Sequence, residues 1–262
     1  MEQEMREAIQ RLINIEVKIN SLLERSQDEA WPGHADQAFG SLTYAQHGED
    51  LIFLNIFYLI GIRQPSYIDV GAYHPLNISN TALLYKKGCR GINIEANPNL
   101  IGEFLVQRPE DVNLNIGIGP EPGRFKFYCI DQWSGRNTFD KLVAEEFVSL
   151  HPQFQIQQVI DIDVTTLNEV VERYASGKFP NLLTIDVEGL DYEILAATQF
   201  EKSRPEIICT ETLSGGDHDD AVRFAHLLGS KGYRQYFRTL GNSIFVTNEV
   251  FDRLYIETGH AY

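Results

Sequence analysis

Basic residues are scarce in this chain. Lysine and arginine together number 22, against 37 aspartate and glutamate residues, so the formal net charge is −15. A surface of that sign repels phosphate backbones and anionic lipid headgroups. The sequence therefore argues against nucleic acids and membrane surfaces as partners.

Cysteines and long apolar segments are also scarce. Cys89, Cys129 and Cys209 cannot all pair with one another and show no metal-ligand spacing, which fits a reduced cytosolic compartment. The most apolar run, residues 51–62, is too short to span a bilayer and is interrupted by Asn55. The N-terminus has no apolar core behind a basic start, so no signal peptide is expected. We therefore expect a cytoplasmic protein without a membrane span.

The first 40 residues differ in composition from the rest. Residues 1–25 contain no glycine, proline or aromatic residue. Spacings of four and three alternate along a heptad seam formed by Met5, Ile9, Leu12, Glu16, Ile19 and Leu23. Two interpretations are open: a short oligomerising coiled coil, weakened by the glutamate in its seam, or a surface helix that packs on its own domain. Residues 26–40 are polar and are typical of a linker. We expect a homo-oligomer with one catalytic domain over residues 41–262.

From residue 41 onward, strand-like and helix-like runs alternate. Strands are expected at residues 67–70, 91–95, 112–118, 125–130, 159–164, 182–187, 207–211, 233–238 and 243–247. Helices are expected at residues 48–60, 79–87 and 218–231, and after positions 97, 165 and 190. The alternation indicates an α/β fold with a doubly wound, mainly parallel sheet covered by helices on both faces. The last two strands form an antiparallel hairpin.

The carboxyl ends of the strands are where a doubly wound sheet binds its ligands. The first strand contains Asp69 and runs into Gly71, but Tyr73 and Leu76 stand where a dinucleotide-binding G-x-G-x-x-G motif needs its other glycines. This absence argues against a nucleotide-sugar oxidoreductase. Glu95 ends the second strand, 24 positions after Gly71, where a carboxylate can accept both hydroxyls of an adenosine ribose. The structural alternative is that Asp69 and Glu95 only cap helices.

Acids at the ends of two strands, with a lone glycine between them, suit S-adenosylmethionine, which carries an amino-acid end, a sulfonium, a ribose and no phosphate. Asp186 and Glu188 leave a later buried strand at the same sheet edge, and Glu211 ends the next strand similarly. Ionised groups rarely occupy such positions without a partner or a task. For Asp186 and Glu188, capping of the helix that begins near Leu190 is the structural alternative.

Six motifs stand in order along the chain. They are YAQHGED at 44–50, YIDVGAYHP at 67–75, SNT at 79–81, YKKG at 85–88, RGINIEANP at 90–98 and TIDVEG at 184–189. Their order and spacing resemble the FkbM-type family of S-adenosylmethionine-dependent methyltransferases, over about residues 41–250. The resemblance implies the class I methyltransferase fold, a seven-stranded sheet whose last strand is antiparallel. It also implies methylation of hydroxyl groups on sugars, glycans or polyketide-type natural products.

The same resemblance implies roles for single residues at the cofactor. Asp69 and Gly71 would line its methionine end, Glu95 would hold the ribose, Asn97 would lie beside the adenine, and Asp186 would lie close to the transferable methyl. The cofactor site is thereby expected at the ends of three neighbouring strands.

The chain departs from the commonest methyltransferase glycine motif at one position. Tyr73 stands where a second glycine often does, so Tyr73 and His74 are expected to point over the cofactor. The resemblance implies no settled role for Gln46, Glu49 and Asp50, which are suited to ordering the cofactor loop from the preceding helix.

Methyl transfer to a sugar hydroxyl requires positioning of the two reactants and a base for the hydroxyl proton. The candidate bases are Asp186, Glu188, His74 and His218. His74 can titrate near neutrality in the cofactor turn, or it can bond loop backbone instead. His218 lies in an acidic loop that could cover the acceptor, or it belongs to a helix start rich in acids.

A divalent metal is an open alternative, because hard oxygen ligands are available from Asp186, Glu211, Asp217, Asp219 and Asp220. No tight ligand motif occurs, and no metal site is predicted. The predicted activity is O-methylation of a sugar hydroxyl of a glycan, nucleotide sugar or glycosylated natural product. The alternatives are a catalytically silent binding or assembly module and the oxidoreductase considered above.

Overall fold

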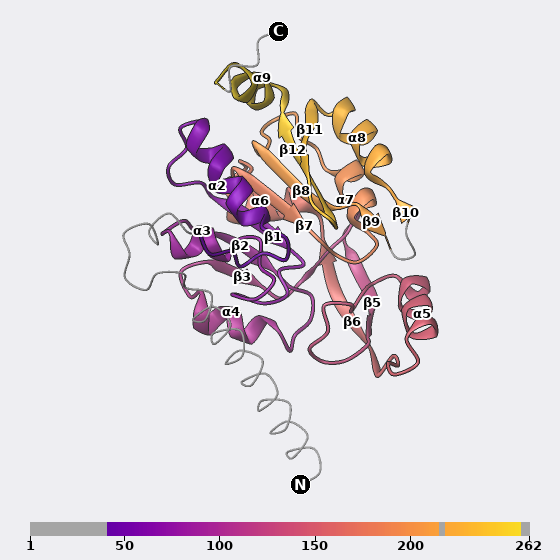
Figure 1. Ribbon diagram of the computed structural model, residues 1–262. Coiled ribbons are helices and arrows are strands. Elements are labelled where there is room, and N and C mark those ends of the chain that lie inside the picture. Colours follow the sequence, from indigo (N-terminus) through magenta and orange to yellow (C-terminus); the bar gives the residue numbers. More distant parts are fainter. Residues whose placement is uncertain (1–40, 215–217, 258–262) are drawn as a thin grey trace, which may run out of the picture. The chain divides into compact units, whose positions relative to one another are not determined.

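The computed structural model describes residues 41–214 and 218–257 (Figure 1). The predicted coiled coil, the linker and Asp217 lie outside the described residues. The chain divides into two compact units, and everything below concerns the second of them, Thr43–Tyr262.

Seven strands form the central sheet in the order β11-β12-β8-β7-β1-β2-β3 (Figure 1). They are β1 (Tyr67–Val70), β2 (Gly91–Ile94), β3 (Val112–Leu114), β7 (Leu182–Ile185), β8 (Ile207–Glu211), β11 (Tyr233–Arg238) and β12 (Asn242–Thr247). The five strands from β3 to β8 pair in parallel, whereas β12 runs antiparallel to both of its neighbours. The predicted doubly wound sheet with a C-terminal hairpin is confirmed. Its strand order reverses between β1 and β7, which places a topological switch point there.

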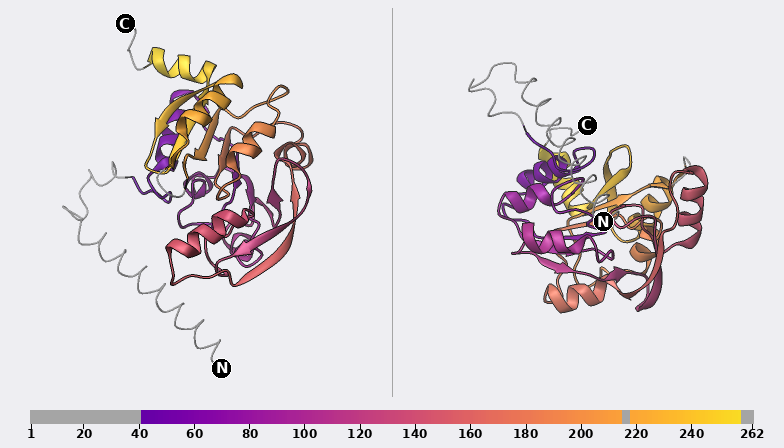
Figure 2. Two further views of the ribbon diagram at one scale, coloured as in Figure 1. Left: turned by 90° about the vertical axis from the view of Figure 1, so that its right-hand side faces the viewer. Right: turned by 90° about the horizontal axis from the view of Figure 1, so that it is seen from below.

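Helices cover both faces of this sheet (Figure 2). They include α2 (Glu49–Leu59), α3 (Ala82–Lys86), α6 (Leu167–Tyr174), α7 (Asp191–Ala197), α8 (Ala221–Ser230) and α9 (Asn248–Glu257). Side chains alternate in direction along a strand, so Ile68 and Val70 enter a core cluster with α6, α7 and α8. Tyr67 enters the opposite cluster, which contains residues of α2, α3 and α9. The sheet is therefore buried on both faces, and ligands can reach it only at its edges.

Some of the predicted strands form a second, smaller sheet. Its three strands are β4 (Gly117–Ile118), β6 (Gln158–Thr165) and β5 (Gly123–Cys129), in that order. The predicted strand at 112–118 was therefore wrong as one element, because it divides between the two sheets. Asn115 lies at the break, and its Nδ2 donates to the carbonyls of Glu95 and Ala96 at 2.8 and 3.1 Å. These bonds turn the chain out of the central sheet.

Several helix boundaries also differ from the predicted ones. The helix expected from Ser79 begins at Ala82, because the Ser79 hydroxyl accepts a hydrogen bond from Ala82 N and closes a turn first. The helix expected after position 97 is α4 (Ile101–Gln107). His218 lies in the short strand β10 (His218–Asp219), paired with β9 (Leu213–Ser214), and not in a helix. Helix α5 (Lys141–Leu150) and helix α9 were not predicted.

A fully buried arginine joins the first strands to the loop that follows β1. Arg108 follows α4 and is 0% exposed. Its Nε donates to Asp111 Oδ2 at 2.9 Å, and its Nη2 donates to Tyr67 Oη at 2.9 Å and to Thr81 Oγ1 at 3.0 Å. The Thr81 hydroxyl donates in turn to Asp69 Oδ2 at 2.6 Å. One guanidinium thus holds β1, the loop after it and the end of α4 together.

Replacing this arginine is expected to destabilise the fold strongly. Arg108→Leu leaves the carboxylate of Asp111 buried without its ion pair, which costs about 3–5 kcal/mol of unfolding free energy. Arg124→Leu is the matched control, because Arg124 faces Asp163 at 3.9 Å on the surface, where a pair contributes at most about 1 kcal/mol. Chemical denaturation measures both. Equal small losses in the two variants would show that the buried network does not stabilise the fold.

Candidate functional site

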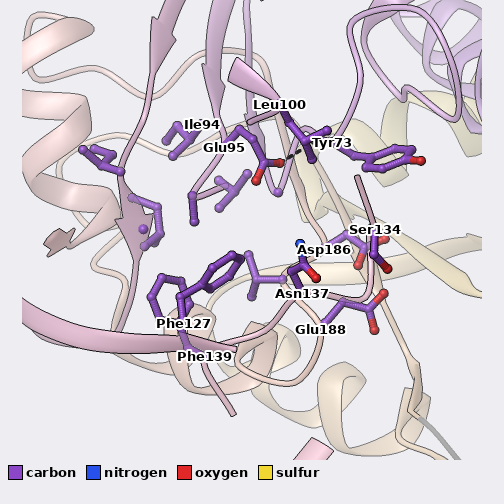
Figure 3. A pocket seen from close by; sticks show the side chains of 18 residues that line it. Tyr73, Ile94, Glu95, Leu100, Phe127, Ser134, Asn137, Phe139, Asp186 and Glu188 are labelled. Carbon is purple, nitrogen blue, oxygen red and sulfur yellow. Dashed lines mark hydrogen bonds between the residues drawn. The ribbon is translucent and has the colours of Figure 1, made fainter. Parts of the chain in front are cut away.

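A pocket lies at the carboxyl ends of β1, β2 and β7 (Figure 3). Its walls come from the turns after these strands, from β4 and from the loop at residues 134–139. The pocket lies at the switch point of the sheet, where doubly wound sheets bind their ligands. Strand topology alone predicts a ligand site here.

One end of the pocket is apolar. Ile94, Phe127 and Phe139 line it, and the rings of Phe127 and Phe139 lie 4.8 Å apart between centroids. Leu100 and Ile116 are further apolar residues of the lining. Figure 3 shows Ile94, Phe127 and Phe139 away from Asp186 and Glu188. Apolar and aromatic walls of this kind suit a flat heterocycle.

Glu95 lies between the apolar end and the acidic end. Its Oε2 accepts from Tyr73 N at 2.9 Å, and its Oε1 accepts from Asn97 N at 2.7 Å. Burial raises the pKa of Glu95 to about 7, although these two backbone bonds oppose the rise. Each carboxylate oxygen keeps a second lone pair, so Glu95 can also accept hydrogen bonds from ligand hydroxyls.

Tyr73 lines the pocket from a strained backbone position. Its φ of 54° lies in the left-handed region, which a bulky residue rarely adopts. A Cβ placed on Gly135 would lie 3.5 Å from the Tyr73 ring, so the loop after β5 approaches this ring closely. His74 does not line the pocket. Its Nδ1 accepts from the backbone N of Leu76 and of Asn77, which is the loop-bonding alternative considered for it.

Two residues expected at the cofactor are not among the residues that line this pocket. Asp69 is buried, accepts from the Thr81 hydroxyl and does not line the pocket. Burial raises the pKa of Asp69 to about 6. Asn97 is also absent from the lining, and its Nδ2 donates to the carbonyl of Gln132 at 3.0 Å. Both residues support turns that carry lining residues.

Gly71 marks the closest approach of β1 to β7. Its φ is +74°, and a Cβ at this position would lie 1.8 Å from the carbonyl oxygen of Asp186. Asp186 N also donates to the carbonyl of Val70 at 3.0 Å. Only glycine fits this position, so Gly71 permits the turns after β1 and β7 to meet in one wall.

Gly71→Ala is therefore expected to lower the unfolding free energy by about 2–4 kcal/mol, through the left-handed φ and the displaced backbone together. Gly102→Ala is the matched control, since a Cβ there meets nothing within 4 Å on α4. That variant should be unchanged or gain up to about 1 kcal/mol. Thermal unfolding compares the pair, and a Gly71 variant as stable as the control contradicts the close approach.

Carboxylates gather at the other end of the pocket. Asp186 and Glu188 line it. Asp191, the first residue of α7, and Glu211, the last residue of β8, lie near them. Glu188 has a left-handed φ of 55°, and its Oε2 accepts from Arg136 Nη1 at 3.0 Å. Strain and an ion pair together fix Glu188 at the pocket wall.

Burial and mutual repulsion raise the pKa values of these acids. The pKa rises to about 7 for Glu188, to about 8 for Asp191 and to about 9 for Glu211, with burial as the main cause and the Asp186 charge next. Burial also raises the pKa of Asp186, while Arg136 opposes the rise. Carboxyl groups whose pKa values are raised in this way are typical of functional sites.

The loop at residues 131–139 contributes residues that sequence reasoning missed. Besides the Arg136 pair, the Thr138 hydroxyl donates to the carbonyl of Glu188 at 2.7 Å, and Asn137 lines the pocket. Gln132 holds the other end of the loop through Asn97. The polar composition of this stretch predicts a loop, but no local signal shows which strand ends it contacts.

Hydrogen bonds link the start of α2 to the loop after β1 and to the C-terminal hairpin. Asp50 accepts from the Thr43 hydroxyl and from Tyr44 N, and the Tyr44 carbonyl accepts from Ser79 N at 2.9 Å. Glu49 is fully buried and its Oε1 accepts from the Thr239 hydroxyl and from Asn242 Nδ2. Gln46 is exposed. Asp50 thus holds the segment that bonds the loop after β1, and Glu49 holds the C-terminal hairpin.

Within residues 41–214 and 218–257, no group of three or more His, Cys, Asp and Glu side chains is arranged to hold a metal ion. In the same part of the chain, no helix has the length and apolar character needed to cross a membrane.

The strand order, the antiparallel β12 and the pocket above β1 define a class I methyltransferase fold. Residues 69–234 match the methyltransferase FkbM domain, which is more than half of the chain. The chain belongs to the FkbM methyltransferase family, an S-adenosylmethionine-dependent group. Among solved structures it is similar to a TehB-like SAM-dependent methyltransferase from Corynebacterium glutamicum, at 13% identity and a TM-score of 0.37, over 87% of this chain and 97% of that chain. A search of curated proteins gives no match.

Proposed function

We propose that the chain is an O-methyltransferase that methylates a sugar hydroxyl of a glycan, nucleotide sugar or glycosylated natural product. The observation that carries this proposal is a single pocket with an apolar end, a buried glutamate in the middle and carboxylates at the far end. S-adenosylmethionine has the same sequence of parts: a heterocycle, a ribose and a cationic methyl donor.

The residues present fit this cofactor. Ile94, Leu100 and Ile116 offer apolar walls for the adenine. Glu95 keeps free lone pairs for the two ribose hydroxyls. Gly71 lets the turns after β1 and β7 meet in the pocket wall that carries Asp186. Asp69 and Asn97 support the site indirectly: Asp69 accepts a hydrogen bond from Thr81 in the loop after β1, and Asn97 donates one to the loop at residues 131–139.

S-adenosylmethionine supplies a methyl carbon activated by its sulfonium. The chain must supply orientation and a proton acceptor. Asp186 lines the pocket, and no residue that the structure describes donates a hydrogen bond to its carboxylate. Its raised pKa suits a base that works near neutral pH, because proton transfer is most efficient when the two pKa values approach each other. Glu188, held by Arg136, is the second candidate.

The acidic end also supports a polyol acceptor. Carboxylates accept hydrogen bonds from several hydroxyls at once, and Asp186 and Glu188 are both at the wall. A methyl-transfer screen with mass readout tests the proposal, using neutral sugars, nucleotide sugars, capsule-type glycans and small aglycones. The expected result is methylation of a sugar-bearing acceptor. Methylation confined to aglycones, or binding of NAD in place of S-adenosylmethionine, would contradict it.

A further inference from the structure

Hydrogen bonds close the base of the loop at residues 131–139. Thr138 pairs with Tyr128 of β5 through two backbone hydrogen bonds of 2.8 and 3.2 Å. Asn137, which lines the pocket (Figure 3), accepts a hydrogen bond from Ile130 N at 2.8 Å. The base of the loop is therefore fixed, and the place of its remaining residues depends on contacts farther along the loop.

One such contact lies at the end of the pocket where Glu95 is held. Asn97 Nδ2 donates to the carbonyl of Gln132 at 3.0 Å, while Asn97 N donates to Glu95 Oε1 at 2.7 Å. Asn97 is only 1% exposed, and hydrogen bonds are stronger in such a region of low dielectric constant. Asn97 therefore ties the loop to the carboxylate that is proposed to hold the ribose.

Two further contacts lie at the acidic end of the pocket. The Thr138 hydroxyl donates to the Glu188 carbonyl at 2.7 Å, and Arg136 Nη1 donates to Glu188 Oε2 at 3.0 Å. Glu188 lines the pocket with a left-handed φ of 55°. Such a conformation persists only where surrounding contacts hold it. The loop supplies two of these contacts, so it connects the two ends of the pocket.

We infer that Asn97 and Thr138 are positioning residues for methyl transfer, which act through the loop at residues 131–139 to fix Glu188 relative to a cofactor held at Glu95. The inference rests on the proposed function. Neither Asn97 nor Thr138 lines the pocket, so their effect should fall on the placement of the reactants and not on cofactor affinity. A misplacement of about 1 Å at a reacting centre lowers a rate by about 10²-fold.

Three substitutions separate this role from a general loss of structure. Asn97→Ser removes the donor to the Gln132 carbonyl but keeps an oxygen that can accept from Asn99 N, as the Asn97 side chain does at 3.1 Å. Thr138→Val removes the hydroxyl at nearly constant shape, and Thr138→Ser restores it.

Turnover is measured with the acceptor found in the methyl-transfer screen. We expect kcat to fall by about 10- to 100-fold in Asn97→Ser and Thr138→Val, with S-adenosylmethionine affinity changed by less than about threefold. Thr138→Ser should recover most of the parent kcat. Asn99→Ser is the matched control, because it makes the same change at an exposed position of the same turn, and it should leave kcat unchanged.

The double variant tests whether the two residues act through one loop. Residues that act as a unit have non-additive effects, so Asn97→Ser with Thr138→Val should lower kcat by no more than about threefold below the slower single variant. If Thr138→Val does not fold, Arg136→Gln takes its place, because Arg136 holds the same glutamate from a half-exposed position. Losses that multiply would overturn the inference.

Tryptophan fluorescence tests the connection without any acceptor. The sequence contains two tryptophans, Trp31 and Trp133, and Trp133 lies in the loop with 48% of its surface exposed. In a Trp31→Phe background, saturation with S-adenosylhomocysteine should lower the quenching of Trp133 by acrylamide, because a ligand at the pocket restricts the loop. Adding Asn97→Ser should remove at least half of this change while calorimetry still detects binding.

An equal change in quenching with and without Asn97→Ser would overturn the inference and leave the cofactor site standing. Absence of S-adenosylhomocysteine binding to the parent protein would instead overturn the proposed cofactor site, and the inference with it.

Discussion

The Asp186→Asn variant is expected to turn over more than about 10²-fold more slowly than the parent, with a smaller change in S-adenosylmethionine affinity. The substitution keeps the size of the side chain but removes its charge and most of its basicity. Asp186 lines the pocket at the end of β7, with a pKa raised by burial. A carboxylate in that state can take the hydroxyl proton as the acceptor oxygen is methylated.

The pH dependence of kcat is an independent test of the role of Asp186. A base must be deprotonated to work, so kcat should rise with pH. Because burial raises the pKa of Asp186, the rising limb should lie above the ordinary range of an aspartate and should be lost in Asp186→Asn. Near-normal turnover of this variant would place the base elsewhere, with Glu188 next. Loss of parent activity in chelator, restored by Mg²⁺, would make Asp186 a metal ligand.

The second large effect is expected at Glu95. Glu95→Ala should weaken S-adenosylmethionine binding strongly, because each charge-assisted hydrogen bond to a ribose hydroxyl contributes about 1.5–3 kcal/mol. The same change also frees Tyr73 N and Asn97 N, which Glu95 holds at 2.9 and 2.7 Å. The alanine variant therefore reports on the turn as well as on the ligand.

Glu95→Gln separates these two contributions. The amide keeps one acceptor oxygen but loses the charge, so the dissociation constant should rise by about 10- to 100-fold with a small loss of stability. Glu103→Gln is the control, since Glu103 lies exposed on α4 and its carboxylate accepts a hydrogen bond from the Gln107 side chain. Calorimetry measures the affinities and denaturation the stabilities. An unchanged dissociation constant for Glu95→Gln would remove Glu95 from the site.

The sequence predicts those parts of the site that follow from sheet topology. Gly71, Glu95, Asp186 and Glu188 each follow or end a strand, and all four line the pocket. Parallel strands bring their carboxyl ends to one edge, so apolar runs and the residues after them are enough to place these side chains together. The central sheet was predictable for the same reason.

Side chains bonded to neighbours outside their own segment were not predictable. Asp69 lies inside β1, one residue before its end, and Thr81 and the Arg108 network hold its carboxylate. No local pattern shows that a distant arginine will be buried there. The loop that carries Arg136 reaches Glu188, 52 positions away in sequence, and such contacts depend on the complete fold.

The most direct test of the account is the atom to which the methyl group is transferred. The parent protein is incubated with S-adenosylmethionine carrying a ¹³C-labelled methyl group and with the acceptor found in the screen, and the product is examined by carbon–proton correlation NMR. The account predicts that the labelled methyl is attached to an oxygen of a sugar ring, and that Asp186→Asn fails to form this product at the parent rate. A labelled methyl on nitrogen, sulfur or carbon would contradict it.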